Sequence, residues 1–242
     1  MADKLNVNST SYTFTFAIIV CALSAILLSG VSEGLRKKQE LNVELDVKKN
    51  ILKAVVLKEP LPVKITTQEV LKVFENKIEE LVIDDKGEIV KGKKPSEIAE
   101  AKDLHPVYIY KEGQEIISYA LPIVGQGLWS TLYGYLALEA DGTTIRGITY
   151  YKHGETPGLG GEIEKDWFQN NFKGKTIYSV KEHKLTPIKV VKGKAADLFH
   201  GDDLQYHVDG ITAATLTGNG VTEMMDKWIK IYEPYFSKIR EL

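Results

Sequence analysis

The sequence contains one cysteine, Cys21, among its 242 residues. A single cysteine cannot form an internal disulfide, so no covalent cross-link within the chain contributes to its fold. The sequence also lacks an excess of either sign of charge, because 31 basic and 33 acidic side chains leave a formal net charge of -2. Proteins that bind nucleic acid usually present a basic face, and nucleic acid is therefore not an expected partner.

Familiar catalytic motifs are missing as well. The five histidines are scattered, and none stands at metal-ligand spacing from another histidine or from the cysteine. HGE at 153–155 lacks the second histidine of a zinc-binding helix. GQGLWS at 125–130 matches a dinucleotide-binding loop at three positions, but β-rich residues follow where that motif needs a helix. Neither a P-loop nor a GxSxG motif occurs. The sequence therefore predicts no metal site and no general acid or base.

A long apolar run stands near the N-terminus. Tyr12–Val31 has no charged residue, and about 20 apolar residues in a helix span the hydrocarbon core of a bilayer. A cleaved signal peptide is the alternative, but its apolar core is typically shorter, about 7–15 residues. We therefore predict an uncleaved transmembrane helix. Arg36, Lys37 and Lys38 follow it, and the positive-inside rule alone predicts that the C-terminal part is cytoplasmic.

The residues after this span are predicted to be helical. Apolar positions recur at helical spacing through a stalk over 32–58, and the two prolines of EPLPV at 59–63 then interrupt the helix. Thr66 followed by Glu69 is a capping-box pattern that begins a second helix, with an apolar face extending through Ile78 and Leu81. Residues 59–105 are thus predicted to form a helical connector.

From residue 106 the period changes to that of strands. VYIY and IISYALPIV flank a turn at Glu112-Gly113, and two β-rich runs flank Asp141-Gly142, a dipeptide typical of tight hairpins. A glycine-rich loop at 153–162 leads to a short helix with Ile163, Trp167 and Phe168 or Phe172 on one side, and a long amphipathic helix ends the chain. We predict an α+β domain over 106–242, in which an antiparallel sheet has flanking helices, after a tail (1–11), a transmembrane helix (12–31), the stalk and the connector.

One segment combines hydroxyls with very small side chains. VDGITAATLTGNGV at 208–221 contains three threonines, two adjacent alanines and three glycines directly ahead of the last helix. Small residues allow close approach of a ligand to the backbone, and a helix N-terminus favours a phosphate. A threonine hydroxyl at this place can become an ester oxygen of that phosphate. The alternative is a threonine-rich turn that only caps the helix.

DGITAAT at 209–215 resembles the flavinylation motif of proteins that carry FMN bound through its phosphate to threonine. The resemblance implies that Thr215 receives the flavin and that Thr217 is the nearest competitor. Ala213 stands where that motif often has glycine. The other residues that the motif implies for cofactor binding are Asp209, Gly210, Thr212 and Ala214.

Two further stretches, GQGLWS and HGETPGLGGE, resemble segments of the C-subunit family of sodium-translocating NADH:quinone reductases. With the N-terminal span, the resemblance covers nearly the whole chain. It implies that the loop at 155–160 wraps the isoalloxazine ring, through Glu155, Thr156, Gly158, Leu159 and Gly160. Leu128 and Trp129 are predicted to close the other side of the ring, with burial in the core as the alternative for each.

The resemblance implies a membrane-anchored electron carrier within a multi-subunit complex, a component of the reductase that does not oxidise NADH by itself. Its expected partners are the membrane and redox subunits, a flavin transferase during maturation, and the lipid bilayer. The family also implies a cell inner membrane location with the flavin domain on the periplasmic side, against the charge bias. Two alternatives remain. One is the G subunit of Rnf-type electron-transport complexes, which has a similar motif, and the other is a membrane-anchored scaffold without a redox role.

Overall fold

The computed structural model describes residues 9–55, 66–98 and 100–240. These fall into two compact units, Met1–Asp46 and Val47–Leu242. Helix α1 (Thr10–Val55) begins in the first unit, and its last turns belong to the second. Its apolar stretch is exposed, and α1 is the one described helix that is long and apolar enough to cross a membrane. The continuous helix agrees with the predicted span and stalk. The break predicted at 59–63 lies outside the described residues.

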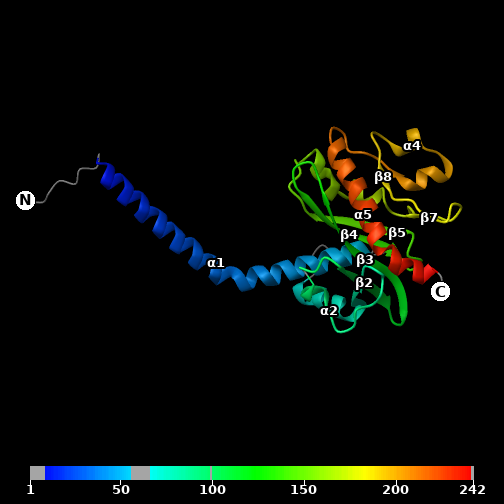
Figure 1. The fold of residues 1–242 in the computed structure, drawn as a ribbon, viewed down its shortest axis with the longest axis horizontal. Helices are drawn as coiled ribbons and strands as arrows, with labels where there is room; N and C mark the ends of the chain where they lie inside the picture. Colours follow the sequence, from blue (N-terminus) through cyan, green and yellow to red (C-terminus); the bar gives the residue numbers. More distant parts are fainter. Residues whose placement is uncertain (1–8, 56–65, 99, 241–242) are drawn as a thin grey trace, which may run out of the picture. The chain divides into compact units, whose positions relative to one another are not determined.

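The second unit is built on a five-stranded antiparallel sheet whose strands follow one another in the order of the sequence (Figure 1). The strands are β1 (Ile78–Asp84), β2 (Leu104–Glu112), β3 (Glu115–Gln126), β4 (Thr131–Glu139) and β5 (Ile145–Lys152). Neighbouring strands pair along their length, with Tyr108 opposite Ala120 and Ala120 opposite Ala137. The predicted α+β class with an antiparallel sheet is confirmed.

The second predicted helix is partly wrong. Helix α2 (Thr67–Lys77) has the expected capping box, in which the Thr66 N–H donates to the Glu69 carboxylate at 2.8 Å. It ends at Lys77, however, and the next seven residues form the edge strand β1. Ile78 and Leu81 fit one face of a helix by spacing, but pairing with β2 satisfies the backbone groups of this segment instead. The sheet therefore begins inside the segment predicted to be a helical connector.

Both faces of the sheet are covered. Alternate side chains of a strand point to opposite faces, and in β2 Val107 and Ile109 belong to one buried cluster while Tyr108 and Tyr110 belong to another. The last turns of α1 and helix α2 pack on the tyrosine face. Helix α5 (Thr215–Arg240) covers the other face. Two covered faces explain why these strands are apolar on both sides.

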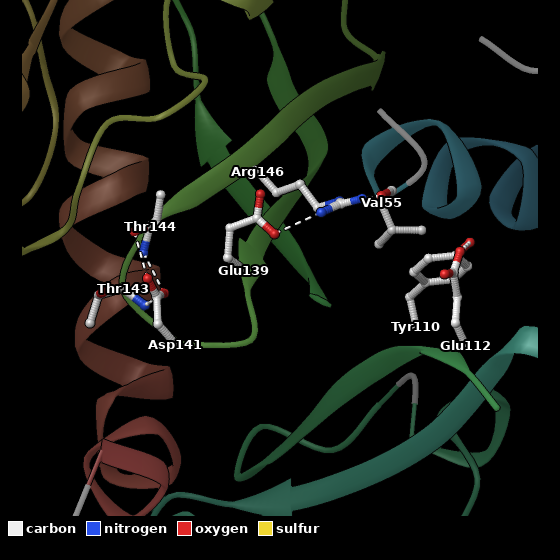
Figure 2. Close-up of polar contacts among 8 residues, drawn as sticks. All are labelled: Val55, Tyr110, Glu112, Glu139, Asp141, Thr143, Thr144 and Arg146. Atoms are coloured by element: carbon white, nitrogen blue, oxygen red, sulfur yellow. Dashed lines mark hydrogen bonds and ion pairs between the residues drawn. The ribbon is translucent and has the colours of Figure 1, made fainter. Parts of the chain in front are cut away.

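Polar contacts fix the hairpin of β4 and β5 (Figure 2). At the turn, the Asp141 carboxylate accepts hydrogen bonds from the backbone N–H groups of Thr143 at 2.7 Å and Thr144 at 2.8 Å. A tight hairpin turn of the type predicted here has positive φ angles at its central residues. Gly142 has a φ of 65°, whereas Asp141 is not among the described residues with positive φ, so only the glycine meets this expectation. Beyond the turn, Arg146 binds both the Glu139 carboxylate and the carbonyl of Val55, which attaches the end of α1 to the sheet.

The remaining elements are short. A 3₁₀ turn η1 (Pro95–Glu97) lies between β1 and β2. After β5 come η2 (Gly160–Glu164), α3 (Asp166–Asn170), β6 (Tyr178–Ser179), β7 (Lys184–Leu185), β8 (Lys189–Val190), α4 (Ala195–Leu198), η3 (Gly201–Tyr206) and β9 (His207–Val208). Ile163, Phe168 and Phe172 are fully buried in the core, whereas Trp167 is 46% exposed.

Candidate functional site

The carboxylate of Glu155 joins three segments that are far apart in the sequence. Its Oε1 accepts hydrogen bonds from the backbone N–H groups of Trp129 at 2.9 Å and Ser130 at 3.2 Å. Its Oε2 accepts from the Leu128 N–H at 3.2 Å and from the Thr217 hydroxyl at 2.5 Å. The β3–β4 loop, the loop after β5 and the first turn of α5 therefore meet at one side chain.

Two glycines give this carboxylate its space. A Cβ on Gly127 would lie 2.6 Å from Glu155 Oε1, and a Cβ on Gly160 would lie 2.7 Å from Oε2 and 2.5 Å from the Thr217 hydroxyl oxygen. A third glycine brings α5 close to β3, since a Cβ on Gly220 would lie 2.1 Å from the carbonyl oxygen of Gln126. Backbone atoms cannot yield as a side chain can, so this close approach requires glycine.

Glu155 is only 5% exposed, yet it favours the charged form. Burial by itself raises the pKa of this carboxyl, because it penalises the charge. The hydrogen bonds from Thr217 and from the N–H groups of Trp129, Leu128 and Ser130 outweigh burial and lower the pKa below its ordinary value. The site therefore contains a fixed negative charge at neutral pH, which these neutral donors stabilise.

The threonine segment is attached to the fold on its other side. Strand β9 pairs in parallel with β8, with Val208 opposite Val190. Immediately after β9, the Asp209 carboxylate accepts a hydrogen bond from the Ala195 N–H at 2.8 Å. A Cβ on Gly210 would lie 2.0 Å from the carbonyl oxygen of Val191, so no larger residue fits there. The position of the segment before α5 is thus fixed by its backbone.

The two candidate threonines have opposite environments. Thr215 begins α5 and its side chain is exposed, whereas Thr217 is 1% exposed. The turn before the helix contains Ala213, whose φ of 59° lies in the left-handed region that glycine adopts freely. Ala214 is buried and its carbonyl accepts the N–H of Gly218 at 3.0 Å, which closes the first helical turn. Of these two threonines, only Thr215 is thus exposed to solvent.

Large apolar side chains remain exposed on the segments that meet at Glu155. Trp129 is 70% exposed, Leu216 58%, Leu128 44% and Leu159 40%. The alternative of core burial for Leu128 and Trp129 is therefore excluded. Exposed apolar side chains gathered on neighbouring loops mark a surface that binds another apolar body.

The structure thus brings five of the predicted site residues together, namely Leu128, Trp129, Glu155, Gly160 and Thr217. Other predicted residues lie elsewhere on the same segments: Asp209 and Gly210 contact the segment 191–195, Thr212 and Thr215 are exposed around the turn, Ala214 is buried, and Thr156, Gly158 and Leu159 are exposed in the loop. Sequence reasoning did not single out Gly127, Ser130 and Leu216. For Leu216 a signal existed, because a large apolar residue stands alone among threonines and glycines.

Comparisons with known proteins identify relatives of the chain. A profile of the FMN-binding domain family matches residues 127–230, which include all three segments around Glu155. The chain is 32% identical to the C subunit of the Na⁺-translocating NADH-quinone reductase of Yersinia pestis, over 98% of this chain and 95% of that protein. It is 34% identical to the corresponding protein of Vibrio anguillarum, over 98% and 97%.

Solved structures are similar as well. The crystal structure of the C subunit from Parabacteroides distasonis superposes with a TM-score of 0.70 at 31% identity, covering 84% of this chain and 97% of that one. NqrC from Shewanella oneidensis superposes with a TM-score of 0.66 at 26% identity, covering 81% and 97%.

Proposed function

The chain belongs to the C-subunit family of the Na⁺-translocating NADH-quinone reductases, and on this basis we propose how it works within such a complex. It is the FMN-carrying electron-transfer subunit. The flavin is esterified through its phosphate to Thr215, and α1 anchors the chain in the membrane. FMN supplies the redox chemistry, while the chain binds and orients the cofactor and shields it from water. NADH is oxidised by partner subunits.

The observation that carries the proposed linkage is the contrast between Thr215 and Thr217. The exposed Thr215 hydroxyl lies at the start of α5, where backbone N–H groups lack partners within the helix and the helix dipole favours an anion. The buried Thr217 hydroxyl is instead bound to Glu155. During attachment the Thr215 O–H bond and a P–O bond of an activated flavin phosphoanhydride break, an O–P bond forms, and the leaving phosphate takes the proton. A flavin transferase supplies this activated flavin.

The surface next to Thr215 fits the rest of the cofactor. The flavin ring has two large apolar faces, and Leu128, Trp129, Leu159 and Leu216 provide exposed apolar side chains on the segments that meet at Glu155. Gly158 has a φ of 75°, and a Cβ added to it would meet no atom within 4 Å, so the loop has open space beside Leu159. Burial of the ring against these side chains stabilises the complex by about 25 cal/mol per Å² of apolar surface removed from water.

Membrane anchoring follows from α1. About 20 of its residues, Tyr12–Val31, form the apolar stretch, which suffices for one crossing of a bilayer. We place the anchor in the cell inner membrane and the flavin domain on the periplasmic side, where the transferase acts. The positive residues after the span oppose this orientation, and packing against helices of partner subunits offsets that bias.

The linkage is tested by producing the full chain together with a flavin transferase. Wild-type protein is expected to gain the mass of FMN less one water, and its denatured band is expected to fluoresce in a gel. Thr215→Ala should abolish both signals, because it removes the exposed hydroxyl at the start of α5. Thr217→Val removes the competing hydroxyl, and any adduct that this variant carries should still map to Thr215. Fluorescence that persists in Thr215→Ala, or a wild-type mass equal to that of the bare chain, would contradict the proposal.

A further inference from the structure

The hydrogen bonds of Glu155 are made within the protein. Its carboxylate is buried and accepts four hydrogen bonds, three from the backbone of the β3–β4 loop and one from Thr217. Gly127 and Gly160 press on its two oxygens from either side, at distances that exclude even a methyl group. The carboxylate thus has four donors within the protein, and these contacts indicate a role in joining the segments that supply them.

The bond to Thr217 holds the first turn of α5 with its buried side inward. Side chains two residues apart in an α-helix point about 200° away from each other. Thr217 lies on the buried stripe that continues through Val221 and Met224, so holding its hydroxyl inward turns Thr215 outward. The first turn of a helix has few backbone hydrogen bonds of its own and frays readily. A buried charge that accepts this hydroxyl is thus well placed to keep Thr215 exposed.

The three backbone bonds act on the opposite segment in the same way. Because the N–H groups of Leu128, Trp129 and Ser130 all converge on one carboxylate, the loop is curled around it. With the N–H groups directed inward, the side chains of Leu128 and Trp129 are left on the exposed side. One carboxylate therefore orients both the first turn of α5 and the loop that bears Leu128 and Trp129.

We propose that Glu155 is a positioning residue that joins the 127–130 loop to the first turn of α5 and thereby presents Thr215 to the flavin. The joining of the two segments concerns the chain alone, whereas the consequence for Thr215 rests on the function proposed above. The low pKa of the Glu155 carboxyl supports this role, since the acceptor stays ionised at neutral pH. Four neutral donors surround it, so its removal leaves the buried Thr217 hydroxyl and three partly buried N–H groups unpaired.

Glu155→Gln is the informative variant because it keeps the shape of the side chain. Its single carbonyl oxygen can still accept two N–H groups, but the amide nitrogen faces the Leu128 N–H, and two donors cannot bond. Glu162→Gln is the matched control, since it removes the same charge from the same loop, and Glu162 binds only the exposed Trp167 indole N–H among the described contacts. Thr217→Val removes one of the four bonds and leaves the three backbone bonds in place.

Amide hydrogen exchange on the flavin-free full chain in detergent tests the junction itself. Glu155→Gln should accelerate exchange about ten-fold in both segments, 128–130 and 216–220, because charged hydrogen bonds are lost or replaced by neutral ones. Thr217→Val should accelerate it in 216–220 alone, and Glu162→Gln in neither. Exchange in Glu155→Gln at the wild-type rate in either segment would overturn the proposal, irrespective of the result for flavin attachment.

Flavin attachment then tests the consequence. With the transferase present, Glu155→Gln should be modified at Thr215 about ten-fold more slowly than wild type, and Glu162→Gln at the wild-type rate. The visible absorption and fluorescence yield of any attached flavin should change in Glu155→Gln, since they report the surroundings of the ring and not overall stability. Modification at the wild-type rate with an unchanged spectrum would overturn the positioning role. Absence of any adduct on wild-type protein would instead refute the proposed function, and the exchange comparison would still decide the junction.

Discussion

Ala213→Gly is expected to stabilise the protein, although it removes atoms. Ala213 has a φ of 59°, in the left-handed region, where the Cβ of an L-residue approaches the following carbonyl oxygen. Its side chain is exposed, so deleting the methyl group gives up almost no buried apolar surface. Glycine has no Cβ and adopts this conformation without strain. The same reason explains why the related flavinylation motif often has glycine at this position.

The expected gain is a difference of two terms. Relief of left-handed strain contributes about 1–2 kcal/mol. Against it, glycine increases the conformational entropy of the unfolded chain, which costs about 0.4–1 kcal/mol. The net stabilisation is therefore about 1 kcal/mol, which for a domain of this size raises Tm by about 2–4 °C.

The neighbouring alanine provides the control. Ala214 is 5% exposed and is not among the described residues with positive φ. Ala214→Gly releases no strain, removes a buried methyl group and adds the same unfolded-state entropy, so it should destabilise by about 1–2 kcal/mol. Urea and thermal denaturation of the two full-length variants, followed by tryptophan fluorescence, should give shifts of opposite sign. Shifts of the same sign would refute the assignment of strain to Ala213.

Two further predictions concern the β4–β5 hairpin in Figure 2. Arg146→Met should lower the free energy of unfolding by about 2 kcal/mol, since it leaves the partly exposed Glu139 carboxylate and the Val55 carbonyl unpaired. Urea denaturation measures this loss. If adding Glu139→Gln to Arg146→Met restores none of the lost stability, the account is contradicted. Burial raises the pKa of Asp141, but hydrogen bonds from Thr144 and Thr143 lower it overall, so its stabilisation is present above about pH 4 and is lost as pH falls through the folded pKa. Asp141→Asn should therefore make stability less dependent on pH below about 4, and an unchanged acid titration would contradict this account.

Sequence patterns with a short range were sufficient for much of the fold. The period-2 strands, the turns at Glu112-Gly113 and Asp141-Gly142, the capping box at Thr66 and the long apolar helix all depend on residues close together in the chain. Such patterns report local propensity and the side of an element that is buried. The error at Ile78–Asp84 arose where a helical period and a strand period fit the same few residues, and pairing with a distant strand decided between them.

The sequence by itself determined the motif, the family and the expected cofactor, because DGITAAT and ETPGLG are each an unbroken stretch of sequence that can be recognised without coordinates. The resemblance assigned the flavin to Thr215, with Thr217 as the nearest competitor, and the sequence left Leu128 and Trp129 between the core and the surface. Only the tertiary structure shows that Thr217 is buried against Glu155, a residue 62 positions earlier in the chain, and that Thr215, Leu128 and Trp129 are exposed. The hydrogen-bond partners of a buried carboxylate come from segments that are distant in the sequence, so no local sequence pattern predicts them.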